Sequence, residues 1–168
     1  MGDRTATAVE IRPVIETDLE ALVDIYLAGA RHHVAIDPDG FRMPERSAVA
    51  ARLRRRFENV GPDHGYVIAL VGNEPAGSAT MDVAEPPHPG SMYRSVPSAE
   101  LGIAVLDGWR GQGIGRRLIE HLEKWAAERG VERITLTVSE TNDGAIRLYH
   151  DLGYVVSGRE MRKDLARS

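Results

Sequence analysis

The sequence predicts a mixed α/β fold in which helices flank a mostly antiparallel sheet. Short β-branched runs alternate with stretches whose apolar residues recur at helical spacing. Two of the runs, residues 66–71 and 77–83, are joined by the turn sequence GNEP, as in a β-hairpin. A glycine-rich loop, RGQGIG at 110–115, joins a strand-like run to an amphipathic helix pattern. With 168 residues, the chain is about one domain long and can bury a substantial core.

The N-terminal half predicts one strand and two helices before the hairpin. Residues 11–15 (IRPVI) form the strand, and Thr17 with Glu20 fits a capping box that begins the first helix. Residues 31–44 are rich in turn formers and predict a loop, after which Pro44 suits the first position of the second helix. That helix carries its apolar residues at Val49, Leu53 and Phe57.

The C-terminal half predicts an alternation of strands and helices. A proline-rich loop at 85–98 precedes a strand at 100–105. After the glycine loop, one helical face is apolar and Gly130 closes the helix. Strands at 133–138, 154–157 and 160–165 and a helix at 142–151 complete the order β-α-α-β-β-β-α-β-α-β-β. The apolar helical face consists of Ile114, Leu118, Ile119, Leu122, Trp125 and Ala126.

Composition excludes several classes of function. A formal net charge of −4 argues against non-specific nucleic-acid binding, and the arginines of residues 52–56 fit a solvated helix face. The chain has no cysteine, which rules out disulfides, a cysteine nucleophile and thiolate metal sites. The six histidines show no metal-ligand spacing, so we expect no metal. No signal peptide or membrane-spanning stretch is evident, and we expect a cytoplasmic protein without a membrane partner.

The glycine loop fits one of three phosphate-binding patterns. A Walker loop requires Gly-Lys-Ser/Thr, but Arg116 and Arg117 follow Gly115. A dinucleotide fingerprint requires a third glycine where Arg116 stands. The pattern Arg/Gln-x-x-Gly-x-Gly/Ala, which opens a helix after a strand, fits from Arg110 to Gly115. Free amides at a helix N-terminus bind phosphates, although a glycine-rich turn can also serve only to pack a helix on a sheet.

Two motifs in order resemble the GNAT superfamily of acetyl-coenzyme A-dependent N-acetyltransferases. Residues 100–130 (ELGIAVLDGWRGQGIGRRLIEHLEKWAAERG) are similar to that family's coenzyme-binding motif. Residues 137–156 (TVSETNDGAIRLYHDLGYVV) resemble its next motif. The resemblance is strong over residues 99–157 and covers the N-terminal half only in outline. It implies a flexible N-terminus at 1–9, a single N-acetyltransferase-like domain at 10–165, and central strands that splay apart.

The resemblance also implies which residues bind acetyl-CoA. The backbone of Ile103 and Val105 would contact the pantetheine arm, and one amide there would hold the thioester carbonyl. Asn142 would contact the same arm, cap its helix, or do both. The remaining residues would hold the pyrophosphate, with charge-assisted bonds from the two arginines. These residues are Arg110, Gly111, Gln112, Gly113, Gly115 and Arg116.

A base and an acid suffice for direct transfer of the acetyl group to an amine. Glu100 is the candidate base because strand alternation places it on one face with the small residues Gly102 and Ala104. The resemblance implies that it acts through a water, and an exposed glutamate at a strand end is the alternative interpretation. The resemblance also implies that Tyr149 is the acid, whereas a core tyrosine is the alternative.

The sequence gives little information about the molecule that accepts the acetyl group. Acidic residues on or beside the expected acceptor loops, at 31–43 and 85–98, suit a cationic amine, which could be a small molecule or a peptide. Two other hypotheses are a non-catalytic acyl-CoA-binding or sensing module and a nicotinamide-dependent enzyme. The sequence leaves open whether the chain forms a homodimer. The acidic residues are Asp37, Asp39, Glu45, Asp82 and Glu85.

Overall fold

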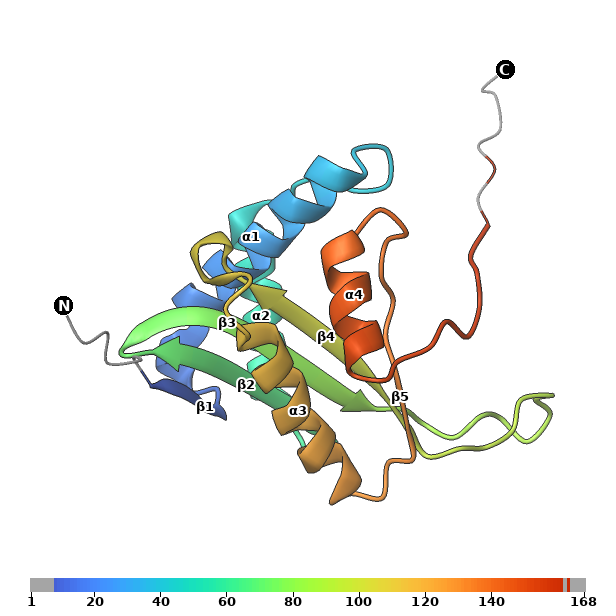
Figure 1. The fold of residues 1–168 in the computed structure, drawn as a ribbon. Coiled ribbons are helices and arrows are strands. Elements are labelled where there is room, and N and C mark those ends of the chain that lie inside the picture. The colour runs from blue at the N-terminus through green and yellow to red at the C-terminus, as the bar shows by residue number, and fades with distance from the viewer. Residues whose placement is uncertain (1–7, 162, 164–168) are drawn as a thin grey trace. The chain divides into compact units, whose positions relative to one another are not determined.

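The computed structural model describes residues 8–161 and 163, and a five-stranded sheet is its main feature (Figure 1). Strands adjacent in sequence are adjacent in the sheet, in the order β1-β2-β3-β4-β5. The first three pairings are antiparallel, and β4 pairs with β5 in parallel. This confirms the predicted mixed α/β class. The elements are β1 (Val9–Pro13), η1 (Glu16–Asp18), α1 (Leu19–Ile36), α2 (Arg46–Glu58), β2 (His64–Val71), β3 (Glu74–Val83), β4 (Ser98–Val105), η2 (Asp107–Trp109), α3 (Ile114–Ala127), β5 (Arg133–Thr135) and α4 (Asp143–Asp151).

The chain forms two compact units, one ending at Thr137 and the other beginning at Val138. All five strands and the first three α-helices belong to the first unit, and α4 belongs to the second. Within the described residues, no helix is both long enough and apolar enough to cross a membrane.

Helices pack on both faces of the first unit's sheet (Figure 1). On one face, Tyr66 and Ile68 of β2 join a core cluster with side chains of α1 and α2. On the other face lies Gly65, where a Cβ would meet Leu122 of α3 at 3.0 Å. The apolar face predicted for α3 is confirmed, because five of its six residues are at most 1% exposed and Trp125 is half-buried. Those five residues are Ile114, Leu118, Ile119, Leu122 and Ala126.

An ion pair between Arg12 and Asp18 stabilises the turn that precedes α1. Arg12 donates two hydrogen bonds to the Asp18 carboxylate, at 2.7 and 2.9 Å, and the Ile15 amide donates a third at 2.8 Å. Asp18 is 8% exposed, and the bonds from Arg12 lower the pKa of its carboxyl group despite burial. The chain makes the short turn η1 here, so the predicted capping box of Thr17 and Glu20 is wrong. The reason is that Asp18 binds the Ile15 amide, and α1 begins only at Leu19.

We expect Asp18→Asn to lower the free energy of unfolding by about 2 kcal/mol at pH 7, the usual scale for hydrogen bonds to charged groups. A carboxyl whose pKa is lowered by folding stabilises above its unfolded pKa, and this stabilisation is lost as pH falls through the folded value. The difference in the free energy of unfolding between Asp18→Asn and the wild type should therefore become smaller at acid pH. Urea unfolding at pH 7 and about pH 3 measures this difference. Asp24→Asn, in an exposed pair with Arg46, is the matched control and should change little. An equal loss at both pH values would contradict the assignment.

Three N-terminal elements have boundaries that differ from prediction. The first strand is Val9–Pro13 rather than 11–15, because the ladder with β2 begins at Val9. Val9 lies in this strand, and residues 1–7 of the predicted flexible N-terminus lie outside the described part. Helix α1 continues to Ile36 because the first proline after its start is Pro38, so the expected 31–44 loop is shorter. Pro44 precedes α2 by two residues instead of opening it.

The last strands also differ from prediction. The expected strand 133–138 is paired only over Arg133–Thr135. The expected strand at 154–157 is neither helix nor strand, and the same holds for the described part of 160–165; residues 162, 164 and 165 lie outside the described part. A strand requires a hydrogen-bonded neighbour, and the described residues provide none there. Val155 and Val156 are 81% and 73% exposed.

Candidate functional site

The glycine loop lies between η2 and the first turn of α3. Gly111 and Gly113 have φ angles of +71° and +79°, which side chains other than glycine rarely adopt. A Cβ added at either residue would point into open space. The first hydrogen bond of α3 runs from the Arg117 amide to the Gly113 carbonyl, so the helix N-terminus faces the same loop. The amides of the first turn of α3 have no intrahelical partner, as at any helix N-terminus, and phosphate binding by this loop stays a prediction.

The other predicted phosphate ligands differ in what they contact. Arg110 donates hydrogen bonds from Nε to the Val105 carbonyl at 3.0 Å and from Nη1 to His32 Nδ1 at 2.9 Å. These bonds connect the loop to β4 and to α1. Gln112 donates to the Gly108 carbonyl at 2.9 Å and closes the loop on itself. Gly115 lies in the first turn of α3. A phosphate contact by the Arg110 or Gln112 side chain stays a prediction.

Arg116 lies at the start of α3, with its side chain 40% exposed and 4.0 Å from Glu120. We expect Arg116→Ala to weaken CoA binding by about 1–3 kcal/mol at low salt, because charge-assisted bonds to phosphate would be lost. The loss should shrink as ionic strength rises. Isothermal titration with CoA at two salt concentrations measures it. Arg117→Ala is a matched control, because Arg117 donates to the Val9 carbonyl. Wild-type affinity of Arg116→Ala at low salt would place this side chain on an ordinary solvated face.

Strand β4 has one edge that β5 covers only in part. The β4–β5 ladder extends from Ser98–Arg133 to Glu100–Thr135, and within the described residues the rest of β4 pairs with β3 alone. Ile103 and Val105 lie in this second part, although Arg110 occupies the Val105 carbonyl. An edge of this kind can hydrogen-bond an extended ligand.

Glu100 is exposed at the point where the ladder with β5 ends. The predicted alternation is confirmed here, since Ala99 and Leu101 are buried and Gly102 is exposed like Glu100. A Cβ at Gly102 would lie 2.8 Å from Thr80 Oγ1, which explains the glycine.

Glu100 belongs to a row of polar side chains across three strands. It pairs directly with Asp82 of β3, and Asp82 pairs with His64 of β2, so all three lie on one face of the sheet. Asp82 Oδ1 accepts hydrogen bonds from Arg56 of α2 at 2.5 Å and from His64 Nδ1 at 2.9 Å. Sequence reasoning placed Asp82 beside a loop and did not single out His64 or Arg56 as site residues.

The electrostatics of this row favour a charged carboxylate. Desolvation acts to raise the pKa of Asp82, but the hydrogen bonds from Arg56 and His64 outweigh it, so this pKa is lowered. Arg56 also lies over the Tyr66 ring, 5.5 Å from its centroid. Burial raises the pKa of Tyr66 to about 12, so its hydroxyl stays protonated.

Of the two loops expected to contact the acceptor, one is irregular and the other is partly helical. The loop between β3 and β4 is irregular as predicted, and it exposes Met92 and Tyr93. His32 and His33 belong to α1 rather than to a loop. His33 stacks on Phe41 at 4.8 Å, and burial together with nearby cationic groups lowers its pKa.

The second unit contains the two remaining predicted residues. Asn142 is confirmed as the cap of α4, because its side chain accepts the Ala145 amide at 3.2 Å. Tyr149 lies on α4, with its ring 5.8 Å from that of Tyr154. Burial raises the pKa of the Tyr149 hydroxyl, which is therefore protonated at neutral pH.

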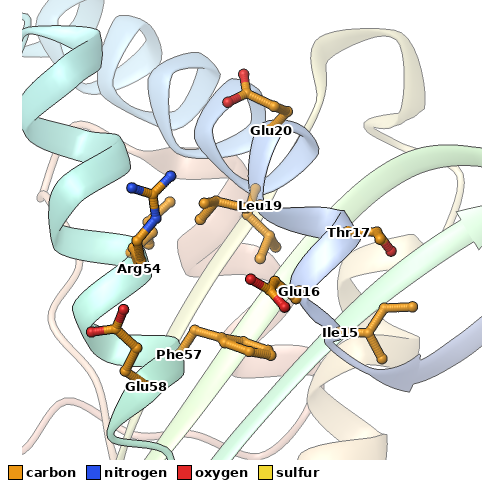
Figure 2. Close-up of a pocket in the computed structure, with 10 residues that line it drawn as sticks. Ile15, Glu16, Thr17, Leu19, Glu20, Arg54, Phe57 and Glu58 are labelled. Atoms are coloured by element: carbon orange, nitrogen blue, oxygen red, sulfur yellow. The ribbon is translucent and has the colours of Figure 1, made fainter.

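A cavity of about 340 Å³ lies elsewhere, between η1, the start of α1 and the end of α2 (Figure 2). Its lining includes the apolar side chains of Phe57 and Leu19 and the carboxylates of Glu16 and Glu58. None of the predicted site residues lines this cavity. Among the described residues, no group of three or more histidine or acidic side chains could hold a metal ion.

Comparison with known proteins identifies the family. The model of the acetyltransferase (GNAT) family matches residues 30–154, so the chain belongs to this family. L-amino acid N-acetyltransferase AaaT of Escherichia coli is 30% identical over 101 residues, covering 58% of this chain and 57% of the relative. Streptothricin acetyltransferase of Streptomyces lavendulae is 41% identical over 56 residues, covering 33% and 30%. Phosphinothricin N-acetyltransferase of Streptomyces coelicolor is 26% identical over 150 residues, covering 87% and 81%.

Solved structures share the fold at low identity. A point mutant of the BH1408 protein of Bacillus halodurans superposes with a TM-score of 0.83 at 21% identity, over 94% of this chain and 99% of that one. Aminoglycoside N-acetyltransferase AAC(6')-Iy, solved with CoA, gives 0.72 at 19% identity, over 98% and 99%. The chain spans 57% and 30% of the AaaT and streptothricin relatives, so the matched parts are partial.

Proposed function

We propose that this protein is an N-acetyltransferase that moves an acetyl group from acetyl-CoA directly to a primary amine. The single observation that carries the proposal is the glycine loop at the N-terminus of α3. Its two positive-φ glycines leave open the space in which a phosphate meets backbone amides. Family membership supports the same conclusion.

The residues of the loop fit the coenzyme. The backbone from Gly111 to Arg116 would hold the pyrophosphate, and Ile103 and Val105 of β4 would contact the pantetheine arm. Acetyl-CoA supplies the activated acetyl group when it is bound. The open edge of β4 beyond Glu100 is consistent with a strand-like contact of this kind.

The chemistry requires one base and one acid. An alkyl ammonium has a pKa near ~10, so it must lose a proton before it can attack the thioester. Glu100 is exposed on β4 and takes this proton through a water. Tyr149 donates its hydroxyl proton to the departing thiolate, and its raised pKa keeps this proton in place until then.

The acceptor is a small-molecule or peptide amine. The names of the relatives include acetyltransferases of L-amino acids, of streptothricin and of phosphinothricin. Incubation with acetyl-CoA and a pooled amine library, with release of free thiol as the readout, tests the proposal. Thiol release above background for at least one amine supports it. Release for none would favour a non-catalytic acyl-CoA-binding module, and stabilisation by NAD rather than CoA would favour a nicotinamide-dependent enzyme.

We expect Glu100→Gln to lower kcat/KM by about 10²-fold near neutral pH, the lower end of the range for a lost general base. The rate should recover as pH approaches the pKa of the amine, where the free amine no longer needs a base. A less basic amine should rescue the variant in the same way. Profiles of kcat/KM against pH with two amines measure both effects. Glu74→Gln, which removes an exposed carboxylate at the start of β3, is the control. A wild-type profile for Glu100→Gln would place the base elsewhere.

A further inference from the structure

The row formed by His64, Asp82 and Glu100 contains a second group that can accept a proton. The three residues are paired in register on adjacent strands, so their side chains project from the same face. Adjacent strands lie about 4.8 Å apart, which puts His64 roughly 10 Å from Glu100 across Asp82. Water molecules can bridge polar side chains that are not in direct contact.

The contact with Asp82 selects the tautomer of His64. Nδ1 lies 2.9 Å from Asp82 Oδ1, and a carboxylate only accepts, so Nδ1 carries the hydrogen. The lone pair of the neutral ring is then on Nε2. The side chain is 43% exposed, so Nε2 can exchange protons with water.

Arg56 completes the arrangement. Its hydrogen bond to the same Oδ1 helps to keep Asp82 ionised. The ionised carboxylate can only accept, so it keeps the hydrogen of His64 on Nδ1. The titratable and charged groups that face His64 are Asp82 on β3, Arg56 on α2, Tyr66 on β2 and, across Asp82, Glu100 on β4. Helix α3 packs on the opposite face of the sheet, against Gly65.

We propose that His64, oriented by Asp82, is a second proton acceptor of the acceptor-amine site and takes over the proton that Glu100 removes. This inference rests on the proposed function. The N–H bond of the ammonium breaks as Glu100 accepts the proton through water. The proton then passes through water from Glu100 to His64 Nε2 and leaves from the imidazolium to solvent. An imidazole holds a proton more firmly than a carboxylate does, so this transfer favours the neutral amine.

The test compares His64→Gln and Asp82→Asn with His121→Gln, a histidine exposed on α3. Thermal unfolding with and without CoA first establishes that each variant folds and binds. We expect His64→Gln to lower kcat/KM about 10²-fold near pH 7, the lower end of the range for a lost proton acceptor, and to change the acid limb of the pH profile. Asp82→Asn keeps the imidazole but removes the carboxylate that selects its tautomer, and we expect it to lower kcat/KM in the same direction. Added imidazole should restore a His64→Ala variant but not Glu100→Gln.

The outcomes separate the two proposals. If the wild-type protein acetylates no amine, the proposed function fails and this inference fails with it. If the wild type is active and the pH profiles of His64→Gln and His121→Gln both coincide with it, His64 is only a surface residue. A rate loss in His64→Gln with an unchanged acid limb and no rescue by imidazole would assign it a structural role and overturn the inference.

Discussion

Replacing Tyr149 by phenylalanine is expected to lower the rate of acetyl transfer by about 10²- to 10⁴-fold, the usual range for a lost general acid. The substitution removes one hydroxyl and keeps the ring, which lies 5.8 Å from that of Tyr154. Burial raises the pKa of Tyr149, so the wild-type hydroxyl holds a proton at neutral pH and can give it to the leaving thiolate. Steady-state kinetics with a saturating amine, together with the CoA-induced shift in melting temperature, separates turnover from binding.

Tyr154→Phe is the matched control, because it makes the same change in the neighbouring ring. We expect it to retain most of the activity. The loss in Tyr149→Phe should persist with a weakly basic amine, whereas the same amine rescues Glu100→Gln. Full activity of Tyr149→Phe would mean that the ring only packs and that the thiolate departs without an acid.

The glycine loop and α3 could be predicted from sequence because their signals are local. Gly111 and Gly113 have backbone angles that only glycine adopts readily. The helical spacing of apolar residues in α3 correctly predicts which of its residues are buried. Asn142 caps its helix as its residue type suggests. Each of these features depends on residues within a few positions of one another.

The polar row could not be predicted because it depends on a β-bulge. A two-residue turn that pairs Val71 with Glu74 would place His64 opposite Met81 if the register continued unchanged. The register shifts between Ala69 and Leu70, so His64 instead faces Asp82. A shift of one residue exchanges the two faces of a strand. Pro75 and Gly77 lie at this point of β3 and are residues typical of a bulge, but the prediction from spacing alone did not use them.

The positions at which strands end also could not be predicted from the local sequence. Residues 133–138 alternate as a strand should, but pairing stops at Thr135. Val155 and Val156 have high strand propensity, yet no described strand pairs with them. Propensity states what a segment can form, whereas a ladder requires a partner from elsewhere in the chain.

We expect Gly113→Val to weaken CoA binding by about 10²- to 10⁴-fold. The φ angle of Gly113 is +79°, and a Cβ built there points into open space beside the N-terminus of α3. If phosphate occupies that space, a branched side chain displaces it from the amides. Two lost charge-assisted hydrogen bonds, at about 1.5–3 kcal/mol each, account for the expected range. Isothermal titration with CoA measures the affinity directly.

Gly130→Val separates lost binding from backbone strain. Gly130 ends the turn after α3 with a φ of +73°, and a Cβ there also meets no atom within 4 Å. Both variants place a β-branched residue in the left-handed region, so both should melt at a lower temperature without ligand. Added CoA should then raise the melting temperature of Gly130→Val as it does that of the wild type, and leave Gly113→Val unchanged. Wild-type CoA affinity in a folded Gly113→Val protein would refute the assignment, because the loop could not then hold phosphate against its backbone.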